Sequence, residues 1–480
     1  MLTPTGLAAT PCPGLANQID AVIDQAAFRR SRWGVLIQTL GSQPQTLYER
    51  SADQFFIPAS NVKLLTTAAA LTQLGADFRI RTSIDQIRDA ASDQVQLHLM
   101  GQGDPSIDQP QLETLVQQLV DRDIRQIDQL VVDDRYFRGE AVNPNWEWED
   151  VQAGYGAPVN SLIFAQNWIG LTLIPQALQQ PLQVQWDDPR DGRGWQIVNR
   201  SQTVATQMPE FVAVGRDLSR PILYVQGQLR AGSASEQVAI AEPQPAQRFL
   251  DRLLQTLAAR QITVHAIELI PDSQTVERME NSSSLELLAP REPIAQIESA
   301  PLRELLTEIN QHSNNLYAEA ILRVMGNRAE PRTGSSLESG LSTLKQSLTQ
   351  LEVDPEGYEL VDGSGLARQN LSSPRAIVQT LQAMNQTTDA ALYRNSLSVA
   401  GINGSLAQRF QDTTLDGQLQ GKSGFLTGVV ALSGYLEQQD GTELVFSILV
   451  NHTTQPLGAT QAAIDSILLT VAQSACFSGM

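Results

Sequence analysis

The sequence is poor in cysteine, histidine and basic charge. Its 480 residues include two cysteines and four histidines, and 33 basic residues stand against 52 acidic ones, a formal net charge of -19. Such an acidic balance argues against a nucleic-acid partner and against attraction to an anionic membrane surface. No apolar run approaches the roughly 18 residues of a membrane-spanning helix, so we expect no integral membrane segment.

The scarcity of histidine limits the possible chemistry. None of the four, His98, His265, His312 and His452, has the sequence context of a nucleophile elbow, which argues against a Ser-His-Asp triad. No cluster of His, Cys and Asp has the spacing of metal ligands, so neither a metal nor a cofactor is predicted.

The two cysteines, Cys12 and Cys476, stand close to opposite ends of the chain. Chain ends often meet at a domain surface, so the pair either forms a disulfide suited to an oxidising compartment or consists of two unrelated thiols. The first residues lack both a basic region and an apolar region, so no complete secretory signal is visible. Either the protein is cytoplasmic, or the given start lies after or within a signal that is not shown.

A chain of this length exceeds one ordinary core, so two or three domains are expected. Periodicity predicts helices in two blocks near the two ends, at 17–29, 62–74, 302–309, 316–325, 341–351, 374–384 and 459–472. Strands are predicted close to these blocks, at 33–40, 45–49, 418–424, 429–436 and 444–451. A sheet built from both ends of the chain explains this order.

Between these blocks, residues 84–290 alternate short strands with Gly, Pro and Asp. Strands are predicted there at 95–100, 129–132, 168–173, 222–229 and 264–270, and helices at 111–120 and 246–257. We therefore predict an inserted unit with two nested parts, about 84–170 with 260–290, and about 171–259. The remaining residues, 1–83 and 291–480, would form a discontinuous first domain.

One short segment carries a candidate nucleophile. Lys63 follows Ser60 by three residues in Ile57-Pro58-Ala59-Ser60-Asn61-Val62-Lys63. On a helix these two positions share a face, so the lysine amine can reach the serine hydroxyl. The pattern alone is weak, because a serine at a helix start is more often an N-cap.

Two further segments strengthen this hypothesis. Ser313-Asn314-Asn315 falls at a predicted corner between helices, and Lys422-Ser423-Gly424 falls on a predicted strand. The combination S-x-x-K, S-x-N and K-[ST]-G, in this order, is the signature of penicillin-binding proteins and class A β-lactamases.

On these motifs, the sequence resembles the D-alanyl-D-alanine carboxypeptidase/endopeptidase family of low-molecular-mass penicillin-binding proteins, in the branch with a large insertion. Further matching segments are Gly101–Pro105, Trp148-Glu149-Asp150, Asp362-Gly363-Ser364-Gly365-Leu366 and Arg368. Ser423 stands where many members have Thr, and Asn314 where Asp is frequent. The resemblance implies a multidomain α+β fold, in which a serine β-lactamase/transpeptidase-like domain, an antiparallel sheet with helices on both faces, carries the β-rich insertion.

The resemblance also implies a function and roles. Ser60 would form an acyl-enzyme with peptidoglycan stem peptides or β-lactams, and Lys63, kept neutral beside the second cation Lys422, is the candidate base. Ser313 would relay a proton to the leaving amine, and Asn315 would orient Lys63 and the substrate. Lys422 and Ser423 suit recognition of the terminal carboxylate. The N–H groups of Ser60 and Phe425, which follows Gly424, would form the oxyanion hole.

Asp150 and Arg368 would help to hold the peptide stem, with Asp150 paired to the free amino group of a diamino acid; the alternative for Asp150 is a solvated loop acid. The implied location is periplasmic or otherwise extracytoplasmic. A β-lactamase, a non-catalytic penicillin- or peptide-binding module and a cytoplasmic peptidase remain as alternatives. A β-lactamase ranks low because no deacylating glutamate can be assigned and the insertion is unlike a compact lactamase domain. The oligomeric state is not predicted.

Overall fold

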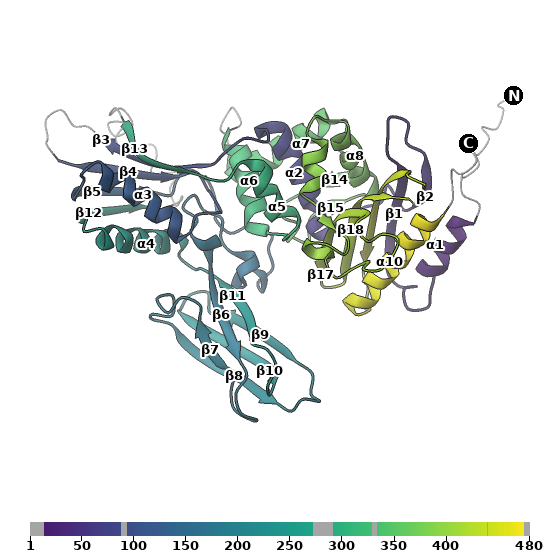
Figure 1. Ribbon diagram of the computed structural model, residues 1–480, viewed down its shortest axis with the longest axis horizontal. Helices are drawn as coiled ribbons and strands as arrows, with labels where there is room; N and C mark the ends of the chain where they lie inside the picture. Colours follow the sequence, from purple (N-terminus) through teal and green to yellow (C-terminus); the bar gives the residue numbers. More distant parts are fainter. Residues whose placement is uncertain (1–13, 88–93, 272–290, 329–333, 439, 475–480) are drawn as a thin grey trace. The chain divides into compact units, whose positions relative to one another are not determined.

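A computed structural model describes residues 14–87, 94–271, 291–328, 334–438 and 440–474 (Figure 1). Cys12 and Cys476, and with them the predicted disulfide, lie outside the described residues. The chain divides into two compact units. The first comprises Met1–Phe78, Pro301–Ala318 and Leu341–Met480, and the second comprises Arg79–Ala300 and Glu319–Gly340.

The first unit is built on one antiparallel sheet of strands from both ends of the chain, as predicted. In spatial order the strands are β16 (Ser398–Val399), β17 (Leu419–Leu426), β18 (Val429–Glu437), β19 (Glu443–Asn451), β1 (Arg32–Thr39) and β2 (Thr46–Arg50). β19 is central, and its register with β1 pairs Val35 with Ile448. Because both faces of β19 are covered, eight of its nine residues are buried.

Helices cover both faces of this sheet, which confirms the predicted fold class. On one face, α1 (Leu15–Ile23) and α10 (Leu457–Gln473) pack on the alternate residues Val35, Ile37 and Ile448 (Figure 1). On the other, α8 (Pro374–Asn385) lies against β1, β18 and β19 and also contacts α2 (Val62–Leu74). The unit also contains α5 (Leu302–Asn310), α9 (Ala390–Asn395) and the short strands β14 (Tyr358–Glu359) and β15 (Leu371–Ser372).

Helix α1 ends six residues earlier than the predicted 17–29. After Asp24 the chain turns, and Phe28 folds back edge-on against Trp33 of β1, with ring centroids 5.5 Å apart. Both rings are buried in the same core as α1. A longer helix would carry Phe28 away from this core, so tertiary packing overrides the local periodicity.

The second unit contains a mixed sheet flanked by helices. Its strands, in spatial order, are β12 (Thr263–Ile270), β5 (Gln126–Asp133), β4 (Gln96–Gly101), β3 (Arg81–Ile87) and β13 (Arg291–Glu298). Apolar side chains of α3 (Gln109–Asp121) and α4 (Pro245–Ala259) complete the core of this sheet. The sequence predicted the helix at 246–257 to belong to the other part of the insertion, about 171–259. Instead, Phe249 and Leu253 of α4 pack into the core of this sheet.

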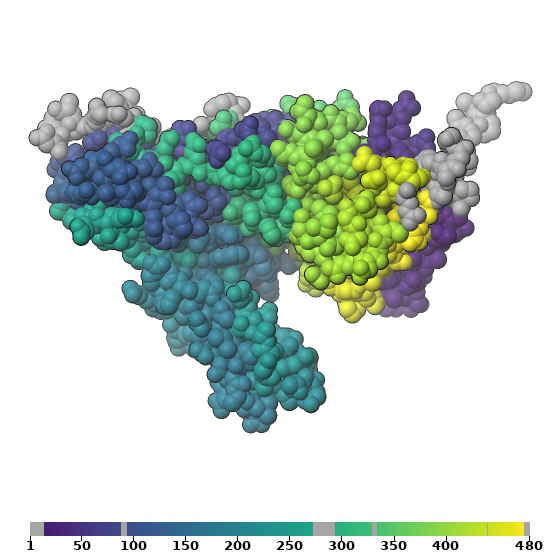
Figure 2. Space-filling model, viewed as in Figure 1, coloured from purple at the N-terminus to yellow at the C-terminus, as the bar shows by residue number. Residues whose placement is uncertain are grey.

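The remaining strands of the second unit form two small sheets that share a core. One contains β8 (Gln196–Val204), β10 (Ile222–Arg230) and β9 (Phe211–Arg216), and the other β11 (Glu236–Ala241), β6 (Trp168–Ile174) and β7 (Gln183–Trp186). Leu171 of β6 and Val225 of β10 are fully buried in this shared core. The resulting sandwich is elongated (Figure 2), and its strands run along its length (Figure 1).

The second unit extends beyond the predicted 84–290 to Arg79–Ala300, which adds β13, and it also includes Glu319–Gly340. These residues include most of α6 (Asn315–Arg328) and the start of α7 (Ser336–Gln350). Asn327 donates a hydrogen bond to the carbonyl of Tyr136, and the Arg138 N–H donates to Ser336 Oγ at 2.8 Å. These partners are about 190 residues apart in sequence, so helical periodicity gave no sign of the boundary. None of the helices in the described residues is both long and apolar enough to cross a bilayer.

Candidate active site

Ser60 lies in a one-turn 3-10 helix, Ala59–Asn61, that leads directly into α2. The sequence predicted Ser60 at the start of a helix; a 3-10 turn holds it there and keeps it beside Lys63, on the first turn of α2. The first ten residues of α2, Val62–Leu71, are all buried, as expected for a central helix. Ala59 has φ 48°, a left-handed conformation that costs a non-glycine residue on the order of 1 kcal/mol.

Two glycines fit closely around this turn. A Cβ atom on Gly365, which has φ +81°, would lie 1.9 Å from the Ala59 carbonyl oxygen. A Cβ on Gly424 of β17 would lie 3.1 Å from the Ser60 nitrogen. The absence of side chains at both positions therefore lets two distant segments pack against the backbone of the candidate nucleophile.

The amine of Lys63 is buried and surrounded by oxygen atoms. Its Nζ lies 3.0 Å from Ser60 Oγ, 2.7 Å from Asn315 Oδ1 and 2.6 Å from the carbonyl oxygen of Ser364. The amide and carbonyl oxygens can only accept hydrogen bonds, so they occupy two N–H groups of the amine. In the neutral amine, the lone pair is then left for the Ser60 hydroxyl, which is the arrangement that a general base needs.

Lys422 is the second buried cation. Its Nζ donates to Ser313 Oγ and to the Ser423 carbonyl, each at 2.9 Å. Burial, and then the charge of Lys63, hold the pKa of Lys422 well below its ordinary value. The structure therefore brings together Ser60, Lys63, Ser313, Asn315 and Lys422, all in the first unit.

Ser313 occupies the corner before α6 with φ 56°, again left-handed. This conformation places its hydroxyl on Lys422 while Asn315, two residues later, reaches Lys63. The polar corner predicted between two helices is thus a link between the two lysines.

The segment Asp362–Leu366 packs against the first turns of α2 and supports the site. Asp362 is fully buried, and its carboxylate accepts hydrogen bonds from the N–H groups of Gly365 and Ala367, both at 2.7 Å. The carbonyl of Gly363 accepts from the Thr66 hydroxyl at 2.7 Å. Sequence reasoning did not identify the Ser364 carbonyl as a partner of Lys63, because every residue has a carbonyl and no side-chain pattern marks this one.

The residues after Lys422 continue along β17. Ser423 is half-buried, and its Oγ lies 2.6 Å from Ser405 Oγ, a contact that the sequence did not predict. The Phe425 side chain is 53% exposed. Its backbone stands next to Gly424, the residue that packs against the Ser60 nitrogen.

Arg368 and Asp150 belong to different units. Arg368 is half-buried and donates to the Thr427 carbonyl, beyond the end of β17, at 3.0 Å. Asp150 is buried in the second unit, where its Oδ2 accepts from the Glu147 N–H at 3.3 Å. Burial, and then the charge of Asp150, raise the pKa of the neighbouring Tyr155 to about 12.

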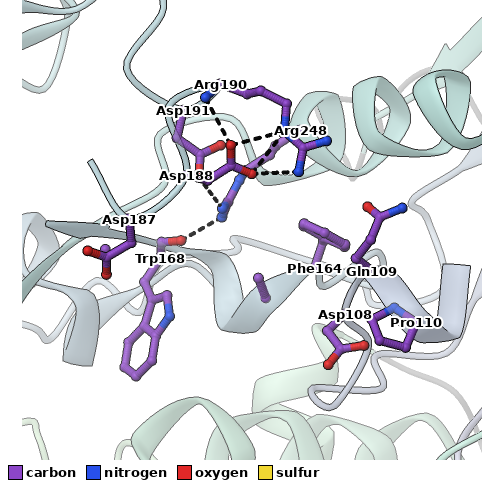
Figure 3. Close-up of a pocket in the computed structure, with 12 residues that line it drawn as sticks. Asp108, Gln109, Pro110, Phe164, Trp168, Asp187, Asp188, Arg190, Asp191 and Arg248 are labelled. Carbon is purple, nitrogen blue, oxygen red and sulfur yellow. Dashed lines mark hydrogen bonds and ion pairs between the residues drawn. The ribbon is translucent and has the colours of Figure 1, made fainter. Parts of the chain in front are cut away.

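A pocket of about 370 Å³ in the second unit is lined by none of these residues (Figure 3). Its charged walls pair with one another: Arg190 binds Asp188, and Arg248 binds Asp191. Buried Arg252 of α4 contacts both of these carboxylates. The ion pairs at this pocket therefore link the chain after β7 to α4. We interpret the pocket as structural and not as a second candidate active site.

Known proteins match the chain over nearly its whole length. A family model described as D-Ala-D-Ala carboxypeptidase 3 (S13) family matches residues 15–471. A D-alanyl-D-alanine carboxypeptidase of Actinomadura sp. (strain R39) is 29% identical over 480 residues, covering 96% of this chain and 85% of that protein. Penicillin-sensitive carboxypeptidase A of Dictyostelium discoideum is 25% identical, with coverage of 92% and 87%.

Solved structures agree on the fold. Penicillin binding protein 4 (dacB) from Haemophilus influenzae superposes with a TM-score of 0.78 at 20% identity, covering 94% of this chain and 98% of that one. The same protein complexed with a β-lactam gives a TM-score of 0.73 at 19% identity, with coverage of 95% and 98%. The family predicted from the three motifs is confirmed: the chain belongs to the D-Ala-D-Ala carboxypeptidase 3 (S13) family.

Proposed function

We propose that this protein is a serine D-Ala-D-Ala carboxypeptidase and endopeptidase that acts on peptidoglycan stem peptides through an acyl-enzyme on Ser60. The observation that carries the proposal is the position of Lys63, whose amine lies 3.0 Å from Ser60 Oγ while Asn315 and Ser364 supply acceptors for its N–H groups. This arrangement gives the serine a base without a histidine.

Acylation begins when neutral Lys63 takes the Ser60 proton. Ser60 Oγ attacks the carbonyl carbon of the penultimate D-alanine, and the N–H groups of Ser60 and Phe425 stabilise the oxyanion. The peptide C–N bond then breaks as an ester to Ser60 forms. Ser313 relays a proton: its hydroxyl gives one to the leaving amine while its oxygen takes another from the ammonium of Lys422, which donates to it. Ser313 therefore stays neutral, and the two lysines together still hold one proton. Water subsequently hydrolyses the ester and restores the Ser60 hydroxyl.

Substrate recognition divides between charge and hydrogen bonding. Lys422 and Ser423 suit the terminal carboxylate of the substrate or of a β-lactam, since a charge-assisted hydrogen bond to a carboxylate is stronger than a neutral one. Arg368 and Asp150 are assigned to the peptide stem, with the Asp150 carboxylate pairing with the free amine of a diamino acid. Because peptidoglycan is the substrate, we assign the protein to the extracytoplasmic side of the membrane.

The test combines labelled penicillin with defined peptides. Wild-type protein should form a stable 1:1 adduct and release D-alanine from a stem pentapeptide, while Ser60→Ala should do neither. Mass spectrometry of products from the pentapeptide and from a cross-linked dimer measures the balance of carboxypeptidase and endopeptidase activity. Equal labelling of Ser60→Ala contradicts the proposal, and rapid turnover of penicillin instead of a stable adduct indicates a β-lactamase.

A further inference from the structure

The hydroxyl of Ser423 is held by a serine outside the three motifs. Ser405 lies in a one-turn 3-10 helix, Gly404–Leu406, and its Oγ is 2.6 Å from Ser423 Oγ. This is a short hydrogen bond between hydroxyls. It links the residue proposed to bind the substrate carboxylate to an exposed residue of a separate loop.

A third hydroxyl, Ser398 of β16, fixes Ser405 from the protein interior. Ser398 is fully buried, and its Oγ accepts the Ser405 N–H at 3.1 Å and lies 3.3 Å from Ser405 Oγ. Ser398 pairs with Gly421 of β17, so it belongs to the same sheet edge as Ser423. The three hydroxyls therefore form a chain of hydrogen bonds from the buried Ser398, through Ser405, to Ser423.

The backbone conformation around Ser405 supports this chain of hydrogen bonds. Gly404 has φ +56°, and a Cβ atom there would lie 2.3 Å from Ser398 Oγ, so only glycine allows the turn to approach. Asn403 Oδ1 accepts the Val399 N–H at 2.7 Å, which closes the loop onto the end of β16. Leu406, the last residue of the turn, is fully buried and anchors it.

We propose that Ser405 is a positioning residue that keeps the Ser423 hydroxyl available as a donor to the substrate carboxylate. Without substrate, Ser423 donates its single proton to Ser405. A carboxylate only accepts, so on binding Ser423 turns its proton to the carboxylate, and Ser405 becomes the donor to Ser423 Oγ. Ser398 in turn donates to Ser405, and three hydroxyls aligned in one direction strengthen one another. The inference rests on the proposed function, because it assumes that Ser423 binds a carboxylate.

The first test compares acylation by benzylpenicillin with acylation by its methyl ester, which lacks the carboxylate. Ser405→Ala should lower the second-order acylation rate for benzylpenicillin by roughly 3- to 10-fold, the effect of one net hydrogen bond. It should change the rate for the ester by less than about twofold, and Ser405→Thr should restore the rate for benzylpenicillin. Gln408→Ala, on the exposed side of the same loop, is the control expected to match wild type. Equal losses for the acid and the ester would mean general damage to the site and would overturn the proposal.

The second test is a double-mutant cycle. If Ser405 acts only through Ser423, adding Ser405→Ala to Ser423→Ala should have no further effect on acylation by benzylpenicillin. Additive losses overturn the proposal, since they would mean that Ser405 contacts the ligand directly or acts elsewhere. An unchanged Ser405→Ala single variant also overturns it, while wild-type acylation would still support the proposed function. Absence of acylation in the wild type would refute the proposed function itself.

Discussion

The amine nitrogen of Lys422 lies 2.9 Å from the hydroxyl oxygen of Ser313, and 109 residues separate the two along the chain. The lysine side chain is fully buried, with the second buried amine, Lys63, close enough to lower its pKa. Two buried amines oppose folding, because each loses its hydration and they repel each other when charged. The two lysines therefore lower the stability of the folded protein.

Replacing Lys422 by an apolar residue of similar shape should stabilise the protein. We expect Lys422→Met to raise the free energy of unfolding at pH 6 by about 1 kcal/mol or more while abolishing measurable acylation. The pKa of Lys422 in the folded state lies below the ordinary 10.5. Between these two values the unfolded chain binds more protons than the folded protein, so the free energy of unfolding rises with pH. The destabilisation caused by Lys422 therefore becomes smaller as the pH approaches 10.5. The gain from the variant should accordingly shrink at pH 9. Urea unfolding measures the gain in stability at both pH values, with Lys345→Met, at an exposed position of α7, as a neutral control. A Lys422→Met variant that is less stable than wild type at pH 6 would refute this prediction.

The same lysine should influence the pH dependence of acylation. Repulsion between two cations is mutual, so removing the charge with Lys422→Gln allows Lys63 to keep its proton up to higher pH. We expect the acid limb of the acylation profile to move up by about one pH unit, together with a roughly 10- to 100-fold loss in kcat/KM for carboxylate substrates. Stopped-flow acylation between pH 5 and 10 measures the shift. If the acid limb stays at the wild-type pH, the charge of Lys422 does not influence the protonation of Lys63, and the prediction is wrong.

Gly365 should be essential to the geometry of Ser60. In Gly365→Ala, the new Cβ meets the Ala59 carbonyl and the residue must keep φ +81°, so the turn with Ser60 has to move. We expect at least a 100-fold loss of acylation and a lower melting temperature, since misplacement by about 1 Å costs on the order of 100-fold. Gly458→Ala in α10 is the matched control, because no atom lies within 4 Å of its Cβ position. Wild-type acylation in Gly365→Ala would show that the close contact is not required.

Asp104 of the second unit should weaken the fold at neutral pH. Burial raises its pKa from 3.8 to about 6, while Ser106 donates two hydrogen bonds to Oδ1. The folded protein then binds more protons than the unfolded chain between these values, so the stability contributed by Asp104 is present below pH 4 and is lost as pH rises through 6. Asp104→Asn keeps the Oδ1 acceptor and should be more stable by roughly 2 to 3 kcal/mol at pH 7.5, with no difference at pH 3.5. Chemical unfolding at both values tests this against exposed Asp123→Asn; a gain that is the same at both pH values would exclude titration of Asp104 as its cause.

Asp150 should determine the preference for the third residue of the stem. Its carboxylate is buried and lies beside Tyr155, whose pKa is raised by burial and then by the charge of Asp150. We expect Asp150→Asn to lower kcat/KM about 10-fold or more for peptides with a free side-chain amine, and to leave peptides without that amine within twofold. Glu149→Gln, one residue earlier and exposed, is the matched control. An equal loss on both peptides would assign Asp150 a purely structural role.

The sequence predicted the strands of the first unit more completely than those of the insertion. β17, β18 and β19 are long and buried, so their apolar content is evident in the sequence. In the second unit, the strands that were not predicted are β3, β7, β8, β9, β11 and β13. Of these, β7 and β9 are short and partly exposed, with polar and apolar residues mixed, and only pairing with neighbouring strands defines them. The six-residue helix α9 was missed because it is too short to show a helical period.

The sequence by itself determined the residue types of the site and their order, because Ser60, Lys63, Ser313, Asn315 and Lys422 carry side chains whose spacing marks them. Only the tertiary structure decided that the Ser364 carbonyl receives Lys63 and that Ser405 holds Ser423. It also set the left-handed conformations of Ala59 and Ser313, for which neither residue has a preference of its own. The physical reason is that periodicity records which side chains are buried, whereas contacts between segments hundreds of residues apart depend on how the chain closes around them.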